Sequence, residues 1–114
     1  MNIRKVKKSD FAQLIDLLND IGWFNELFKK SKEDLEIKFV GDINLCLADN
    51  SHSFYVVEEN ENYILGYASV HWLPYLFLDG VEGYISELFV RNNARGKGIG
   101  KELLATIKTE ARNI

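Results

Sequence analysis

The sequence predicts an α+β (mixed α/β) fold with a mostly antiparallel sheet and elements in the order β-α-α-β-β-β-α. Apolar residues recur at helical spacing near both ends of the chain, and shorter strand-like runs lie between them. A turn punctuated by glycines joins the last of these runs to the last helix. With 114 residues and 46 % hydrophobic side chains, the chain is expected to form one domain over residues 1–114.

The N-terminal residues predict a short strand over residues 3–6 and then a helix. Ser9 or Asp10 is placed to cap this helix, and Gly22 is placed to end it. The apolar residues at helical spacing are Phe11, Leu14, Ile15, Leu18 and Ile21.

A second helix is expected after an aromatic connection at residues 23–28. Ser31, with Asp34 three residues later, predicts its N-cap, and the helix extends through Leu35, Phe39 and Ile43. The single cysteine, Cys46, cannot form an internal disulfide and is expected to be a buried thiol.

Three further strands are predicted over residues 54–58, 63–72 and 84–90. A polar turn at 59–62 joins the first two, and Gly66 marks a position where the second strand can bulge. A long apolar connection, 73–83, leads to the third strand.

The most informative segment runs from strand 84–90 into Arg95-Gly-Lys-Gly-Ile-Gly100 and a helix from Gly98 to about Arg112. Glycines at 96, 98 and 100 let the backbone turn tightly and bring its N–H groups close to a ligand. The helix start adds unpaired N–H donors and the positive end of its dipole. A diphosphate site is therefore predicted, with positive charge around it from residues 91–101, including Arg95, Lys97 and Lys101.

Other glycine loops fit this segment less well. A phosphate loop of the G-x-x-x-x-G-K-[ST] type fails, because Glu102 follows Gly100-Lys101 where a hydroxyl is needed and the glycine spacing is one residue short. The dinucleotide fingerprint G-x-G-x-x-G fails on spacing and on the missing second parallel strand. The alternative that the glycines only form a turn between the strand and the helix, with no ligand, stays open.

The pattern [RQ]-x-x-G-x-[GA] is met by Arg95-Gly-Lys-Gly-Ile-Gly100, and on it the chain resembles the GNAT N-acetyltransferase superfamily. The likeness is strongest over residues 87–111, Glu-Leu-Phe-Val-Arg-x-x-x-Arg-Gly-Lys-Gly-Ile-Gly-x-x-Leu-Leu and onward, and looser upstream. The upstream matches are residues 3–6 with Asp10, residues 57–59 and residues 66–68. The resemblance implies the N-terminal part of this acyl-CoA N-acyltransferase fold, a partial domain whose match stops near Ala111.

The resemblance implies acetyl-CoA as the acetyl donor and no metal. Main-chain amides of residues 95–100 are expected to bind the pyrophosphate of coenzyme A. The strand before them is expected to be bulged, so that its free backbone groups pair with the pantetheine arm and one N–H polarises the thioester carbonyl. The cofactor-binding residues are Leu88, Phe89, Val90, Arg95, Gly96, Lys97, Gly98, Ile99 and Gly100.

The family often places an acidic residue before the Leu-x-Val segment, so Glu87 is the expected general base. A salt-bridged or solvent-facing strand glutamate is the alternative. Direct transfer is expected rather than an acyl-enzyme, since Cys46 lies far upstream and no G-x-S-x-G pattern is present. His52 and His71 form no plausible metal set; His71 faces the acceptor site or is an ordinary core or surface histidine.

Aromatic residues from the first-helix connection and the loop after strand 63–72 are expected to line the acceptor cleft. They are Trp23, Phe24, Phe28, Trp72, Tyr75 and Phe77. An aromatic cleft suits an apolar or cationic amine, although each ring is also a candidate core residue.

The expected function is transfer of an acetyl group from acetyl-CoA to a small-molecule or peptide amine. The alternative is a catalytically silent acyl-CoA-binding or interaction module, or a truncated fragment. A net charge of −3 argues against general nucleic-acid binding, and with no apolar run near ~20 residues and no signal region a soluble cytoplasmic protein is expected. The strand 84–90 is expected to be an exposed edge that favours self-association.

Overall fold

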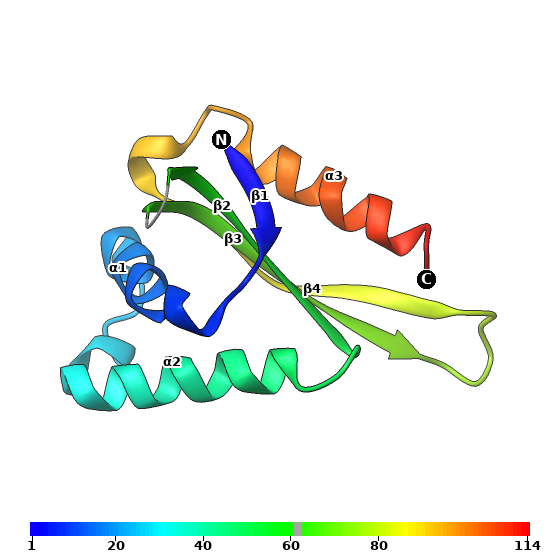
Figure 1. Cartoon of the computed structure of the whole chain (residues 1–114), viewed down its shortest axis with the longest axis horizontal. Helices are drawn as coiled ribbons and strands as arrows, with labels where there is room; N and C mark the ends of the chain where they lie inside the picture. Colours follow the sequence, from blue (N-terminus) through cyan, green and yellow to red (C-terminus); the bar gives the residue numbers. More distant parts are fainter. Residues whose placement is uncertain (61–62) are drawn as a thin grey trace.

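The structure is a computed structural model that describes residues 1–60 and 63–114. It contains a four-stranded antiparallel sheet in the order β1-β2-β3-β4, with α1 and α2 on one face and α3 on the other (Figure 1). The strands are β1 (Asn2–Lys5), β2 (His52–Asn60), β3 (Tyr63–Pro74) and β4 (Val81–Val90). The helices are α1 (Phe11–Ile21), α2 (Lys32–Leu47) and α3 (Ile99–Ala111), and short 3-10 turns are η1 (Lys8–Asp10), η2 (Leu27–Lys29) and η3 (Asn92–Ala94). The predicted fold class and element order are confirmed.

The β3–β4 hairpin is longer than the sequence indicates. Its ladder runs to the pair Pro74↔Val81, so the predicted connection 73–83 is wrong and the loop spans only residues 75–80. Proline is tolerated there because it is the last residue of its strand. At the β2–β3 turn, β2 continues to Asn60, and residues 61–62 of the predicted polar turn lie outside the described residues.

A bulge next to Gly66 confirms the sequence prediction. Val57 pairs with Gly66 but Glu58 pairs with Ile64, so Leu65 is the extra residue. A Cβ on Gly66 would lie 2.9 Å from the Phe89 carbonyl oxygen and 3.2 Å from a methyl of Ile99. The missing side chain therefore lets β4 and α3 pack closely on β3.

The helix boundaries follow the sequence signals, except at the end of α2. Gly22 ends α1 in the left-handed region, and the Ser31 hydroxyl caps α2 by accepting the Asp34 amide at 3.1 Å. However, α2 runs on to Leu47. Its last turn contains Cys46, which is only half-buried, so the prediction of a buried thiol is wrong. Its neighbours Leu45 and Leu47 are exposed, so this end of α2 lies at the surface.

Each face of the sheet has its own hydrophobic cluster, and we name the faces by the helices that cover them. The α3 face buries Tyr55, Val57, Leu65, Ala68, Val70, Trp72, Ala94, Ile99, Leu103 and Ile107. The α1/α2 face buries Val6, Leu14, Leu17, Leu18, Ile21, Ile43, Val56, Ile64 and Tyr67. Because successive strand residues point to opposite faces, neighbouring positions such as Ala68 and Tyr67 serve different clusters.

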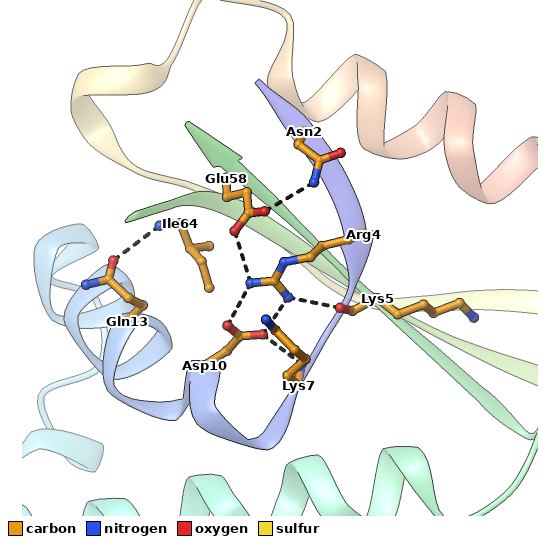
Figure 2. Close-up of polar contacts among 8 residues, drawn as sticks. All are labelled: Asn2, Arg4, Lys5, Lys7, Asp10, Gln13, Glu58 and Ile64. Atoms are coloured by element: carbon orange, nitrogen blue, oxygen red, sulfur yellow. Dashed lines mark hydrogen bonds and ion pairs between the residues drawn. The ribbon is translucent and has the colours of Figure 1, made fainter. Parts of the chain in front are cut away.

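Arg4 ties β1 to the start of α1 and to β2 (Figure 2). Its guanidinium donates to both carboxylate oxygens of Asp10 at 2.9 Å and to Glu58 at 3.1 Å. Asp10 is the N-cap residue of α1, as predicted, but its carboxylate accepts the Lys7 amide at 2.7 Å and makes no capping hydrogen bond to α1. Burial opposes ionisation of Asp10, but these hydrogen bonds hold the pKa of its carboxyl below the usual value.

Candidate active site

A second bulge reorients the middle of β4. Ser69 pairs with Glu87 but Val70 pairs with Ile85, which leaves Ser86 as the extra residue and confirms the bulge that the resemblance implied. After the bulge, Glu87 and Phe89 lie on the α1/α2 face, where the Tyr67 hydroxyl donates to Glu87 Oε2 at 2.9 Å. The strand thus presents a carboxylate to the space under α1 and α2.

Tyr67 holds one side of that carboxylate. Its ring is 2 % exposed and stacks on Phe54 with centroids 5.1 Å apart and an interplanar angle of 13°. Burial first, then the charge of Glu87 and the hydrogen bond, raise the pKa of the Tyr67 phenol far above its usual value. The phenol therefore stays protonated and acts as a fixed donor to Glu87.

A cavity of about 170 Å³ lies between α1, α2 and the sheet, and Glu87 is part of its wall. Its apolar lining comprises Leu14, Leu18, Phe24, Leu27, Phe39, Ile43, Phe54 and Tyr67. Its charged lining comprises Lys38, Asp42 and Glu87, and Lys38 Nζ lies 2.9 Å from Asp42 Oδ2. The cavity therefore combines an apolar interior with a carboxylate.

The predicted aromatic cleft is largely wrong. Of its residues, Phe24 lines the cavity, and Trp23 is exposed but lies with its ring centroid 6.3 Å from that of Phe89. Trp72 falls on the α3 face, where its indole N–H donates to Ser53 at 2.9 Å. Phe28 packs against the α1/α2 cluster, and Tyr75 and Phe77 lie at the far end of the β3–β4 hairpin (Figure 1). Strand parity and hairpin length decide these positions.

The two histidines lie beside this site. Their rings are 4.3 Å apart, edge to face, and His71 Nε2 is 3.0 Å from the Ser86 hydroxyl in the bulge. Burial and the charge of His52 lower the pKa of His71, while the charge of Glu87 opposes this. Across residues 1–60 and 63–114, no group of three or more His, Cys, Asp or Glu side chains is placed to hold a metal ion.

Cys46 is distant in sequence but near the site in space. Burial, followed by the negative charges of Glu87 and Asp42, raises the pKa of its thiol. A thiol whose pKa is raised carries less of the nucleophilic thiolate. The surroundings of Cys46 are therefore the opposite of those that activate a cysteine nucleophile.

The connection from β4 to α3 is fixed to α1. Arg91 is 3 % exposed; its side chain donates to the Ile64 carbonyl at 2.6 Å and to Asp16 at 2.7 Å. The Asn92 amide and side chain both bind Asp20. Arg91 is therefore a buried, paired anchor, and the prediction that it adds free positive charge to the anion site is wrong.

The glycine turn after this anchor is open. Gly96 and Gly98 have φ values of 80° and 78°, in the left-handed region that favours glycine, and α3 begins at Ile99. A Cβ on Gly96, Gly98 or Gly100 would meet no atom within 4 Å. In the part of the chain that the structure describes, the amides of residues 96–101 donate no hydrogen bond. These unpaired N–H groups, at the positive end of α3, suit an anion.

The side chains around the turn add positive charge at the surface. Arg95, Lys97 and Lys101 are exposed, and the Arg95 guanidinium lies 5.8 Å from the centroid of the Trp23 ring. Val90 packs against the cluster on the α3 face, whereas Phe89 packs against the other cluster. By strand alternation, Leu88 lies on the same side of β4 as Val90. The structure thus separates the predicted residues into two places along the chain: Glu87 lies at the cavity, and residues 95–100 form the turn after β4 and η3.

Sequence reasoning missed the partners of Glu87. Tyr67 lies in the segment 66–68, which contributed to the resemblance, yet no role followed from it. Tyr67 and Glu87 lie on neighbouring antiparallel strands. Glu87 pairs with Ser69, and Tyr67 is two residues before Ser69 on the same face, so only the strand register reveals their contact. Asp42 and Phe39 come from α2, whose angle to the sheet no local pattern encodes.

A bulged strand that carries a carboxylate is thus followed, after η3, by an open glycine turn at the start of α3. The model of the acetyltransferase (GNAT) family matches residues 15–114, so the chain belongs to this family. No curated protein gives a significant sequence match.

Solved structures share the fold. A transcriptional regulator from Bacillus halodurans superposes with a TM-score of 0.83 at 24 % identity, over 98 % of this chain and 74 % of its own. Glucosamine-6-phosphate N-acetyltransferase from Arabidopsis thaliana gives 0.77 at 22 % identity, over 98 % and 74 %. A predicted acetyltransferase from Clostridium acetobutylicum, solved with acetyl-CoA, gives 0.69 at 24 % identity, over 98 % and 73 %. At these identities the likeness establishes the fold.

No helix in the described residues is long and apolar enough to span a membrane.

Proposed function

We propose that the protein is an N-acetyltransferase that moves the acetyl group of acetyl-CoA to an amine. One observation supports this most strongly: β4 leads directly from a cavity-wall carboxylate, Glu87, to an open turn of unpaired amides at the start of α3. A donor bound at the turn and extended along β4 would bring its reactive end to Glu87.

The turn fits the pyrophosphate of coenzyme A. The space above Gly96, Gly98 and Gly100 is free of protein atoms within the reach of a Cβ, and the amides there have no partner among the described residues. Backbone donors and the α3 dipole supply the positive field without a metal. Arg95 and Lys97 are exposed and are expected to contribute less than the main chain.

The acceptor amine would lose its proton to Glu87. Tyr67 occupies Oε2, so Oε1 is the oxygen left to accept a proton, directly or through a water. The neutral amine then attacks the thioester carbonyl: an N–C bond forms and the C–S bond breaks. The nitrogen loses its second proton to solvent and the leaving thiolate takes one up from solvent, so the products are an amide and a free thiol. The raised pKa of Cys46 favours this direct transfer over an acyl-enzyme.

Acetyl-CoA binding is tested by calorimetry on the intact chain, with Gly100→Glu as the probe. Gly100 has room for a side chain, and an acidic residue is favoured in the first turn of a helix, so the variant should fold. Its carboxylate should repel the diphosphate and weaken binding at least about tenfold. Gly41→Glu, an equal charge change at an exposed site on α2, is the control and should bind normally. Equal binding by both variants would refute the proposed turn site.

Turnover is tested by release of free thiol with a panel of amines. Binding of acetyl-CoA without turnover on any amine would support the alternative, a catalytically silent acyl-CoA-binding module.

We also propose that the exposed edge of β4 pairs with a second copy when no donor is bound. β4 is the terminal strand of the sheet, and most of its residues are exposed. The pantetheine arm would use the same backbone groups, so acetyl-CoA should dissociate the dimer. Light scattering that finds a monomer at high concentration without acetyl-CoA would contradict this.

A further inference from the structure

We propose that the acceptor is a primary amine bearing one hydrophobic group of about single-ring size, as in phenethylamine. This rests on the proposed function and adds the substrate class. The hydrophobic group would occupy the cavity between α1, α2 and the sheet, and the amine would lie at Glu87.

The size of the cavity sets the size of the group. Its volume is about 170 Å³. An apolar protein cavity of about 150 Å³ stays dry and accepts benzene. One aromatic ring or a branched aliphatic chain therefore fits, whereas a disaccharide or a fused three-ring system does not.

The chemistry of the lining sets the polarity of the group. Phe24, Phe39 and Phe54 supply aromatic walls, and Leu14, Leu18 and Ile43 supply aliphatic ones. A polar group placed among these side chains would lose its water without gaining hydrogen bonds, and this opposes its binding. The interior therefore disfavours sugars and the inner amines of a polyamine.

The charges on the lining set the position of the amine. Among the lining residues that the structure describes, Lys38 is the one cation, and its ammonium pairs with Asp42 at 2.9 Å. Glu87 is then left as the net charge, and Tyr67 orients its carboxylate. A cationic amine is attracted to this end, while an anionic acceptor such as an amino-sugar phosphate finds no free cation among these side chains.

The test compares kcat/KM for a series of amines at saturating acetyl-CoA: ethylamine, isobutylamine, phenethylamine, spermidine and glucosamine 6-phosphate. Discrimination by a hydrophobic pocket amounts to about 10–200-fold per methylene. Phenethylamine should therefore exceed ethylamine by at least roughly 100-fold, with isobutylamine between them. Equal or higher values for spermidine or glucosamine 6-phosphate would overturn the inference.

Two variants locate the group. Leu27→Trp, at the partly buried rim of the cavity, should fill it and raise KM for phenethylamine about tenfold or more. Leu45→Trp is the matched control, because Leu45 is 69 % exposed on α2 and outside the lining; it should leave KM unchanged. Phe39→Ala should enlarge the cavity and shift the preference toward 2-(1-naphthyl)ethylamine. Identical KM values in Leu27→Trp and Leu45→Trp would contradict the assigned position.

The two proposals fail in different ways. If the chain does not bind acetyl-CoA, the proposed function itself fails. If it binds acetyl-CoA and acetylates amines with no preference for the ring, only the substrate class fails. Binding of phenethylamine to the complex with free CoA, followed by NMR shifts of the ring-bearing residues, gives a readout independent of turnover; no shift at Phe39 or Phe54 counts against the inference.

Discussion

The two faces of the sheet are built from the same strands but are filled differently. On the α3 face, Leu103 and Val70 are fully buried, and the Tyr55 hydroxyl donates to Glu110 at 2.6 Å. On the α1/α2 face, the helices leave a cavity of about 170 Å³ with a carboxylate in its wall. Both faces bury apolar side chains, and the α1/α2 face also leaves an apolar space beside a carboxylate.

The difference arises from the helices. α3 directs Ile99, Leu103 and Ile107 at four-residue spacing into the sheet, so it packs closely as far as Ile107, and its last turn borders an open hollow beside Tyr55. α2 buries only Leu35 and Ile43 among its residues, and its Lys38 and Asp42 are exposed at the rim of the cavity. With so few of its side chains buried, α2 does not fill the space between itself and the sheet.

The largest expected effect is on catalysis. Glu87→Gln should lower kcat/KM by roughly 10²–10⁴-fold, because the amide cannot accept the amine proton. The free energy of unfolding should change by less than about 0.5 kcal/mol, since the side chain lies at an open cavity and keeps its oxygen for Tyr67. Steady-state kinetics and urea unfolding of the same variant check both parts. A large loss of stability with normal activity would reverse the assignment of the two faces.

Matched leucines compare the two faces directly. Leu103→Ala on the α3 face should lower the free energy of unfolding by about 2–5 kcal/mol, because it leaves a void in a filled core. Leu27→Ala at the cavity rim should cost about 1 kcal/mol, because it only widens an existing space. Equal losses in chemical denaturation would show that the cavity closes in solution.

A pH-dependent effect of about 1 kcal/mol is expected on the α3 face. Burial opposes ionisation of Glu110, but hydrogen bonds from Tyr55 and Ser53 and the charge of Lys5 lower the pKa of its carboxyl. A lowered pKa stabilises the fold above the unfolded value, and this contribution is lost as pH falls through the folded value.

Tyr55→Phe removes one of these donors, so it should reduce the free energy of unfolding by about 1 kcal/mol at pH 7. The difference from wild type should shrink below about pH 4.3, the usual glutamate pKa, as Glu110 takes up a proton. Unfolding measured from pH 3 to pH 7 tests this, and the double variant with Glu110→Gln is the control. A pH-independent difference would argue against Glu110 as the linked group.

The smallest effect is expected at the glycine turn between β4 and α3. Lys97→Met should weaken acetyl-CoA binding by less than about threefold, since an exposed lysine is worth at most ~1 kcal/mol to an anion. Calorimetry at low and at moderate salt checks this. A tenfold loss would show that side chains, rather than main-chain amides, hold the donor.

The sequence by itself determined the order of the secondary elements and the open glycine turn. Both depend on local chemistry: Ser31 caps its own helix, Gly98 adopts a backbone angle that other residues avoid, and Leu103 and Ile107 follow helical spacing. Such signals act within a few residues, so they can be seen without the fold.

Only the tertiary structure decided how the cavity on the α1/α2 face is built. Trp72 lies on the opposite face of the sheet from the one predicted, and Arg91 is a buried anchor. Tyr67, Phe39 and Asp42 come from distant segments and line the same cavity as Glu87. These outcomes depend on strand parity after two bulges and on how α2 crosses the sheet. Shifting a strand by one residue exchanges its faces. Gly66 marked the first bulge in the sequence, but no residue marked Ser86 as the extra residue of the second.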